Sequence, residues 1–161
     1  LADRLHESGW EVVALTHSEE SAARLRAIKP YPVQAVSIGD ADAVSALANA
    51  EEKFDIAVHC AASSRGGGID SYRQVYRDGF RNLVEMVRPD RMVYTSSTSV
   101  YAQVDGEIVD ETTIAAPTAE TARVIREAEN IVLDAGGVVM RLAGLYGPGR
   151  SVLLRNCCHC C

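Results

Sequence analysis

Short continuous apolar runs alternate along the chain with stretches in which apolar residues recur at helical spacing. The runs have the length of strands and almost no polar interruption, which predicts strands buried on both faces. These predicted strands are residues 10–15, 32–38, 54–62, 91–95 and 138–142. Helical spacing, together with stop signals such as Gly9, Pro30 and Gly136, predicts helices over residues 1–8, 18–29, 42–50, 70–87 and 118–135.

The regular alternation of strands and helices decides the fold class. Strand and helix alternate five times, and no repeat, low-complexity tract or proline-rich linker interrupts the series. This order is typical of a parallel sheet with helices on both sides, the doubly wound α/β class. We therefore expect one domain with a single parallel sheet.

Composition narrows the classes of function. The chain has 161 residues, 47% hydrophobic, enough for one core without a disulfide or metal. Its formal net charge of -6 does not attract the negatively charged backbone of a nucleic acid, so we expect no nucleic-acid partner. No apolar run approaches the ~20 residues that span a bilayer, and the first residues do not have the layout of a signal peptide. We expect a cytoplasmic protein without membrane contact.

The cysteines are unevenly placed. Cys60 stands alone in an apolar run, whereas four of the five cysteines fall in the last five positions, Cys157, Cys158, Cys160 and Cys161. Such a tail could bind a soft metal, but tetrahedral sites usually take their ligands from two separated pairs. The alternative is a remnant of processing or a misread end, which we favour, so we expect no metal site.

The residues that follow the strands are the candidates for chemistry, because ligands of doubly wound sheets bind at the carboxyl ends of the strands. The third predicted strand ends in Cys60-Ala61-Ala62, and serines and glycines follow; these small residues permit close approach of a flat ligand to the backbone. A flexible loop is an equally good interpretation of this segment alone. The next strand ends in Thr95-Ser96-Ser97 and the last in Leu142.

Taken together, these segments resemble the extended short-chain dehydrogenase/reductase family, the NAD(P)-dependent sugar epimerases, dehydratases and their relatives. The matching segments, in family order and spacing, are FDIAVHCAA, GFRNLVE, VYTSSTSVY, the stretch from Asp110-Glu111 to Pro117, and RLAGLYGPGR. The resemblance covers nearly all of residues 1–150. It implies a Rossmann domain that binds a dinucleotide, and an epimerase, dehydratase or reductase acting by hydride transfer on a nucleotide-sugar or other small polar substrate.

The resemblance also implies roles for individual residues. It gives Ser97 the substrate-contacting catalytic role and places the adenine near Asp40. The remaining cofactor-binding positions that it implies are Thr16, His17, Cys60, Ala61, Ala62, Thr95, Ser96 and Leu142. The cofactor is NADP or NAD. An acid after the second strand of such a domain would bind the ribose 2'-hydroxyl, and its absence at Thr16-His17-Ser18 favours NADP, although these residues are also suited to begin the next helix.

One departure from the family pattern concerns the start of the domain. The opening strand and the G-x-G-x-x-G turn that holds the pyrophosphate do not occur in this sequence. In the usual order 3-2-1-4-5-6 that strand lies mid-sheet, between the strands that end near Leu15 and Ala62. We therefore expect a partial dinucleotide-binding domain over residues 1–150, with an interrupted sheet, and a truncated tail over residues 151–161.

A second departure concerns the catalytic Tyr-x-x-x-Lys of the family. Alignment on Ala128-Glu129 places Thr121 at the tyrosine position and Ile125 at the lysine position. A threonine hydroxyl has no accessible pKa for acid/base work, and isoleucine brings no charge to lower one. Ile125 continues an apolar helix face, which predicts packing. Tyr76 stands where the family often has an asparagine that supports the proton relay.

Other side chains could supply part of the missing chemistry. Tyr101 and Tyr146, both near strand ends, could replace the acid, but Tyr101 matches a structural tyrosine of the family. Arg141 could bind a phosphate or serve as an ion-pair partner. Three hypotheses remain open: an enzyme, a dinucleotide-binding module without catalysis, and a truncated form with little activity. Family members often form homodimers through the helices near residues 72–87 and 118–135, so a homodimer is expected as a partner.

Overall fold

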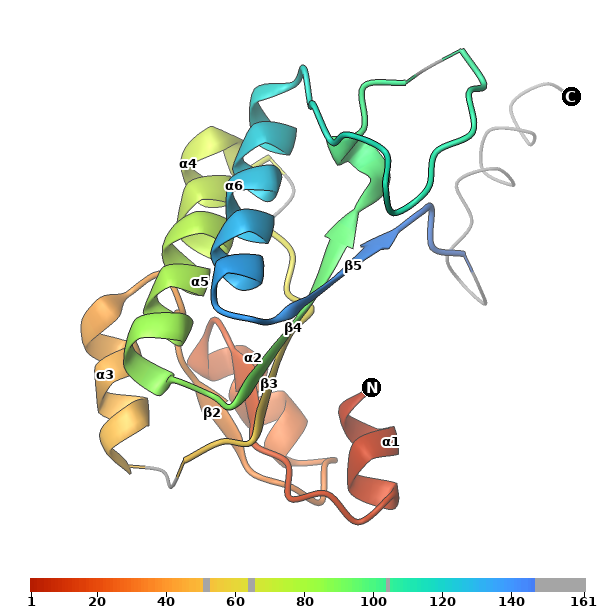
Figure 1. The fold of residues 1–161 in the computed structure, drawn as a ribbon. Coiled ribbons are helices and arrows are strands. Elements are labelled where there is room, and N and C mark those ends of the chain that lie inside the picture. The colour runs from red at the N-terminus through yellow and green to blue at the C-terminus, as the bar shows by residue number, and fades with distance from the viewer. Residues whose placement is uncertain (51–52, 64–65, 104, 147–161) are drawn as a thin grey trace, which may run out of the picture.

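The computed structural model describes residues 1–50, 53–63, 66–103 and 105–146. Every predicted helix and strand is present within them (Figure 1). The first half contains α1 (Ala2–Glu7), β1 (Ala14–Thr16), α2 (Glu19–Arg26), β2 (Val33–Ala35), α3 (Ala41–Ala50) and β3 (Ile56–His59). One continuous helical stretch follows, made of α4 (Gly68–Tyr72), η1 (Arg73–Asp78), α5 (Gly79–Asn82) and η2 (Leu83–Val87). The chain then forms β4 (Arg91–Ser97), η3 (Thr98–Val100), α6 (Glu120–Asp134) and β5 (Val138–Leu142).

The strands form two parallel sheets. One sheet joins β1 to β2, and the other has the order β3-β4-β5. Between the described residues of β1 and β3 there is no strand pairing, so the interruption lies where the sequence predicted it. The described residues thus form a doubly wound α/β fold of Rossmann type, with no described strand between β1 and β3.

A single main core joins the two sheets on one side. Phe80 and Leu83 of the long helical stretch pack with Met92 and Tyr94 of β4 and with Val132 of α6. Figure 1 shows this helical stretch and α6 side by side over the sheet. Other buried members of the core are Val36, Val44, Leu47, Tyr76, Val100, Val124, Ile125 and Ala128. Leu15 of β1 also packs against this core, so both sheets share it.

The opposite faces of the two sheets are covered differently. On β1 and β2, Ala22 and Leu25 of α2 and Ala2 of α1 form a second cluster with Val33. On the sheet β3-β4-β5, the residues alternating with the buried ones remain open, and Ile56, Val138 and Met140 are 42%, 45% and 46% exposed. The prediction that every apolar strand is covered on both faces is therefore wrong for this sheet, because the described helices α1 and α2 pack on β1 and β2 instead.

Candidate functional site

The carboxyl ends of β3, β4 and β5 meet at one edge. The register pairs His59 with Tyr94 and Ser97 with Leu142, and the Thr95 hydroxyl donates to the His59 carbonyl at 3.2 Å. Cys60, Ala61 and Ala62 follow β3 directly and are exposed. The structure thus brings together Cys60, Ser97 and Leu142, as the sequence predicted. Small exposed residues leave the backbone accessible to a flat ligand.

The three polar residues at the end of β4 do not share one face. Side chains alternate along a strand, so Thr95 and Ser97 point away from α6 while Ser96 points toward it. The buried Ser96 hydroxyl donates to Glu129 of α6 at 2.7 Å. Ser96 can therefore contact a ligand at the strand end only through its backbone, whereas Thr95 and Ser97 present side chains to the open face.

Ser97 has a defined hydrogen-bonding state. Its extended backbone precedes the turn η3, and its Oγ accepts the Ser99 amide at 3.1 Å. The hydroxyl oxygen is thereby held by a backbone donor, and its own proton remains available to an oxygen of a ligand. This is the donor that the substrate-contacting role predicted from the sequence would require.

A buried carboxylate lies directly beneath this edge. Glu129 is fully buried on α6, and Arg141 of β5 donates to its two oxygens from Nε and Nη2, both at 2.9 Å. Arg126, one helical turn earlier, donates to the same carboxylate at 3.0 Å. Sequence reasoning considered Arg141 as an ion-pair partner, and the structure confirms that role. It missed Glu129, although its place on the apolar face of α6 could have indicated it.

Arg141 also reaches the segment after β4. Its Nη1 donates to the Tyr101 hydroxyl at 2.9 Å, and its guanidinium carbon lies 4.9 Å from the Tyr101 ring centre. The Tyr101 hydroxyl in turn donates to the Asp110 carbonyl at 2.8 Å. The Glu129 carboxylate, with help from Tyr101, raises the pKa of Arg141. The structure therefore gives Tyr101 and Arg141 structural partners.

The remaining predicted cofactor residues lie on the other side of the interruption. Thr16 ends β1, and its hydroxyl donates to the Ser18 carbonyl at 3.2 Å, while His17 beside it is exposed. Ser18 caps α2 by accepting the Ser21 amide. Asp40 follows β2, and its Oδ1 accepts the Asp42 and Ala43 amides at 3.0 and 3.2 Å. One Asp40 oxygen is therefore engaged in capping α3.

The positions that depart from the family pattern are packed inside. Ile125 and Tyr76 both belong to the main core, which confirms packing for Ile125. Burial raises the pKa of Tyr76, which makes the phenol a poorer proton donor. Thr121 lies partly buried in the first turn of α6. Among the described residues, these three positions offer no tyrosine with a neighbouring cation.

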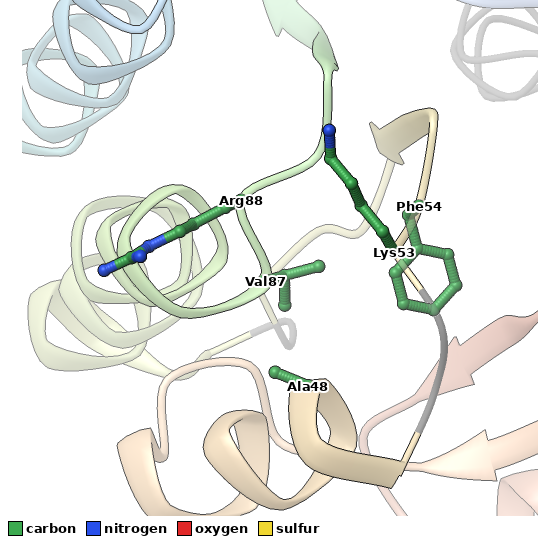
Figure 2. Close-up of a pocket in the computed structure, with 5 residues that line it drawn as sticks. All are labelled: Ala48, Lys53, Phe54, Val87 and Arg88. Atoms are coloured by element: carbon green, nitrogen blue, oxygen red, sulfur yellow. The ribbon is translucent and has the colours of Figure 1, made fainter.

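A separate pocket lies at the other end of the sheet. It has a volume of about 310 Å³ and is lined by Ala48, Lys53, Phe54, Val87 and Arg88. Figure 2 shows the Lys53 and Arg88 side chains extending away from each other rather than converging in the hollow, and Lys53 forms an ion pair with Asp90. Four of its lining residues come just before a strand, Lys53 and Phe54 before β3 and Val87 and Arg88 before β4, so the pocket is not the crevice at the carboxyl ends of these strands.

Two expectations concern metal and membrane. Within the described residues, no group of three or more His, Cys, Asp or Glu side chains could hold a metal ion. The cysteine-rich tail, like the rest of residues 147–161, lies outside them. No helix in the part of the chain that the structure describes is long and apolar enough to cross a bilayer.

Comparison with known proteins finds relatives that match most of this chain. Protein YeeZ of Escherichia coli K12 is 32% identical over 160 residues, covering 93% of this chain and 56% of its own length. The sterol-4-alpha-carboxylate 3-dehydrogenase ERG26 of Saccharomyces cerevisiae is 32% identical over 133 residues, covering 72% of this chain and 38% of its own. The chain thus spans about half, or less, of these relatives.

Solved structures show the same fold. The Bordetella bronchiseptica enzyme WbmH in complex with NAD+ superposes with a TM-score of 0.76 at 22% identity, over 91% of this chain and 51% of that one. The Thermus thermophilus UDP-glucose 4-epimerase complex with NAD superposes with a TM-score of 0.75 at 23% identity. The match covers 92% of this chain and 52% of that one. The model of the NAD dependent epimerase/dehydratase family matches residues 1–156. The chain therefore belongs to the NAD-dependent epimerase/dehydratase family.

Proposed function

We propose that this chain is the dinucleotide-binding part of an NAD(P)-dependent epimerase, dehydratase or reductase that acts on a small polar substrate such as a nucleotide-sugar. The observation that carries this proposal is the edge at which Cys60, Ser97 and Leu142 meet. Its accessible backbone and the oriented hydroxyl of Ser97 suit a flat ring beside a substrate oxygen.

The residues at the edge suit the nicotinamide half of the cofactor, because the exposed small residues after β3 leave room for the ring. When bound, the nicotinamide accepts or donates a hydride. The chain's own contribution is to place Ser97 so that its hydroxyl proton meets a substrate oxygen. Thr16 and Asp40 would lie toward the adenosine end.

The choice between NAD and NADP rests on the end of β1. Thr16, His17 and Ser18 include no carboxylate that would bind a ribose 2'-hydroxyl, and the exposed His17 leaves space for a 2'-phosphate. We therefore propose that NADP is accepted at least as well as NAD.

A second candidate, binding without turnover, is supported by Ile125. Its side chain belongs to the main core, so the cation that would lower the pKa of a catalytic phenol has no counterpart at that position. In this case the protein would respond to the dinucleotide without chemistry. Of the proteins named above, ERG26 is a dehydrogenase and the Thermus thermophilus protein is an epimerase, whereas the name Protein YeeZ states no activity, so the names do not decide between the two candidates.

Calorimetric titration with NAD and with NADP, followed by absorbance assays with a panel of nucleotide-sugars and carbonyl compounds, tests both candidates. Turnover that falls at least about tenfold in Ser97→Ala but not in Ser99→Ala would support the enzyme. Ser99 is a matched control because it lies two residues away and is exposed. Binding without turnover would support the second candidate, and the absence of binding would contradict both.

A homodimer through the long helical stretch and α6 is part of the proposal. Leu133 of α6 is exposed, and a hollow of about 320 Å³ between the two helices is lined in part by Val84 and Ile131. Light scattering of the wild type and Leu133→Glu should show a dimer only for the wild type. The predicted cytoplasmic location remains a prediction.

A further inference from the structure

A cluster made of the buried Glu129 and Ser96 and the partly buried Arg141 and Tyr101 connects four segments around the candidate site. Glu129 lies on α6, Ser96 near the end of β4, Arg141 in β5, and Tyr101 directly after η3. Each contact is a hydrogen bond between 2.7 and 2.9 Å. The cluster extends to the Asp110 carbonyl through the Tyr101 hydroxyl.

Stability alone is a poor explanation for such a cluster. Burial of a carboxylate and a guanidinium has a desolvation penalty that their attraction often only balances, and apolar residues of the same size can do as well. A buried pair of this kind can instead hold the segments around it in one arrangement, because each buried hydrogen-bond donor needs an acceptor at a fixed place. The residues next to the pair therefore indicate which part of the structure is held.

Two partners of Glu129, Ser96 and Arg141, directly precede a residue of the site. Ser96 precedes Ser97, and the bond from Ser96 to Glu129 holds this part of β4 with the Ser97 side chain on the opposite face. Arg141 precedes Leu142, which is paired with Ser97. Tyr101 closes the segment that begins with Ser97, and it holds that segment to the loop at Asp110.

We propose that Glu129 and Arg141 are positioning residues of the cofactor crevice. Their hydrogen bonds fix the positions of Ser97 and Leu142 from the opposite face of the sheet, and through Tyr101 they hold the loop at Asp110 next to the crevice. The inference rests on the proposed function for its effect on ligand binding. Its effect on the loop can be measured without any ligand.

Arg126 provides a matched control. It binds the same carboxylate at 3.0 Å, but it comes from α6 itself, and its hydrogen bonds among the described residues include none to β4, β5 or Tyr101. If Glu129 only requires a neutralising charge, replacement of Arg126 or Arg141 should have similar effects. If the geometry around Ser97 and Tyr101 matters, only replacement of Arg141 should disturb the site.

The first experiment is fluorescence titration of the full chain with NADH, comparing the wild type with Tyr101→Phe, Arg141→Lys, Arg126→Lys and Tyr146→Phe. Tyr101→Phe keeps the ring under the guanidinium and loses only the hydroxyl, while Tyr146 is 90% exposed and controls for loss of a phenol. We expect Tyr101→Phe and Arg141→Lys to weaken binding about fivefold, the effect of one hydrogen bond, and to shift the emission maximum of bound NADH. The two control variants should match the wild type.

The second experiment is amide hydrogen exchange without ligand. The Thr112 and Thr113 amides are bound to Asp110 Oδ1 in the loop that Tyr101 holds, so they should exchange faster in Tyr101→Phe and Arg141→Lys but not in Arg126→Lys. Unchanged exchange would overturn the inference, as would wild-type affinity and emission in both variants or an equal effect of Arg126→Lys. If the wild type itself does not bind NADH, the proposed function fails, and the exchange rates alone decide the inference.

Discussion

His59 should make the stability of the protein fall in mild acid. It ends β3 within an aromatic group, with ring centres 4.3 Å from Phe80, 5.7 Å from Tyr94 and 6.0 Å from Tyr76. Its Nε2 lies 3.3 Å from the Val75 carbonyl oxygen, so Nε2 carries the proton of the neutral ring. Among the described residues the buried Nδ1 has no hydrogen-bond partner, so a second proton on this buried ring is costly.

The size of the effect follows from the pKa. Burial lowers the pKa of His59 from 6.5 to about 4, although hydrogen bonds to the backbone of Val75 and of His59 itself oppose the shift. Between these two values the unfolded chain binds a proton that the folded chain does not, so stability decreases as the pH falls from about 6.5 to about 4. At 1.36 kcal/mol per pKa unit, the loss between pH 7.5 and pH 4.5 is about 2.5 kcal/mol.

Urea unfolding at pH 7.5, 6.0 and 4.5, followed by circular dichroism, measures this loss in the wild type and in His59→Phe. Phenylalanine fits an aromatic site and cannot titrate, so the variant should lose about 2.5 kcal/mol less than the wild type over this range. His17→Gln, at an exposed histidine, should behave as the wild type does. Equal pH dependence in the wild type and His59→Phe would refute the reasoning, whatever the absolute stability of the variant.

Two further predictions concern the sheets. Among the described residues, β1 and β3 each have one edge without strand pairing, whereas β4 is paired on both sides. About half of the backbone amides of β1 and β3 should therefore exchange their hydrogens orders of magnitude faster than those of β4. Uniform protection would show that the edges are closed. Met92→Ala should reduce the free energy of unfolding by about 2–4 kcal/mol and Met140→Ala by less than about 1 kcal/mol, because Met92 is buried and Met140 is half exposed. Equal losses in urea unfolding would mean that the open face is covered in solution.

The elements of the fold could be predicted well from the sequence because most of their signals are local. Ser18 indicates the start of α2, and its hydroxyl caps that helix. Strand ends were less accurate: residues 10–15 were predicted as a strand, yet only Ala14–Thr16 pair with a neighbour. Strand pairing depends on the neighbouring chain as well as on the apolar run. The open face of β3-β4-β5 was missed for the same reason, since an apolar pattern shows only that burial would be favourable.

The sequence predicts which residues lie at the candidate site when their position in the fold places them there. It predicts less well the direction in which their side chains point. Ser97 and Cys60 lie at the expected edge because parallel strands bring their carboxyl ends together. Ser96 was grouped with them, but alternation along β4 turns its side chain to Glu129. The partner of Arg141 could not be identified from the sequence, because 12 positions separate it from Glu129 and only the packing of α6 on the sheet brings them together.

A dinucleotide that extends from the end of β1 to the end of β4 must bridge two sheets without a strand ladder between them, so their spacing depends on other contacts. Those contacts come from the long helical stretch. Asn82 donates to the Ile38 carbonyl at 2.9 Å. A Cβ on Gly39 would lie 2.7 Å from the Gln74 carbonyl oxygen, so only glycine allows the segment after β2 to pack so closely on the helix. The helix, which also packs on β4, thus sets the distance between Asp40 and Ser97 in place of backbone pairing.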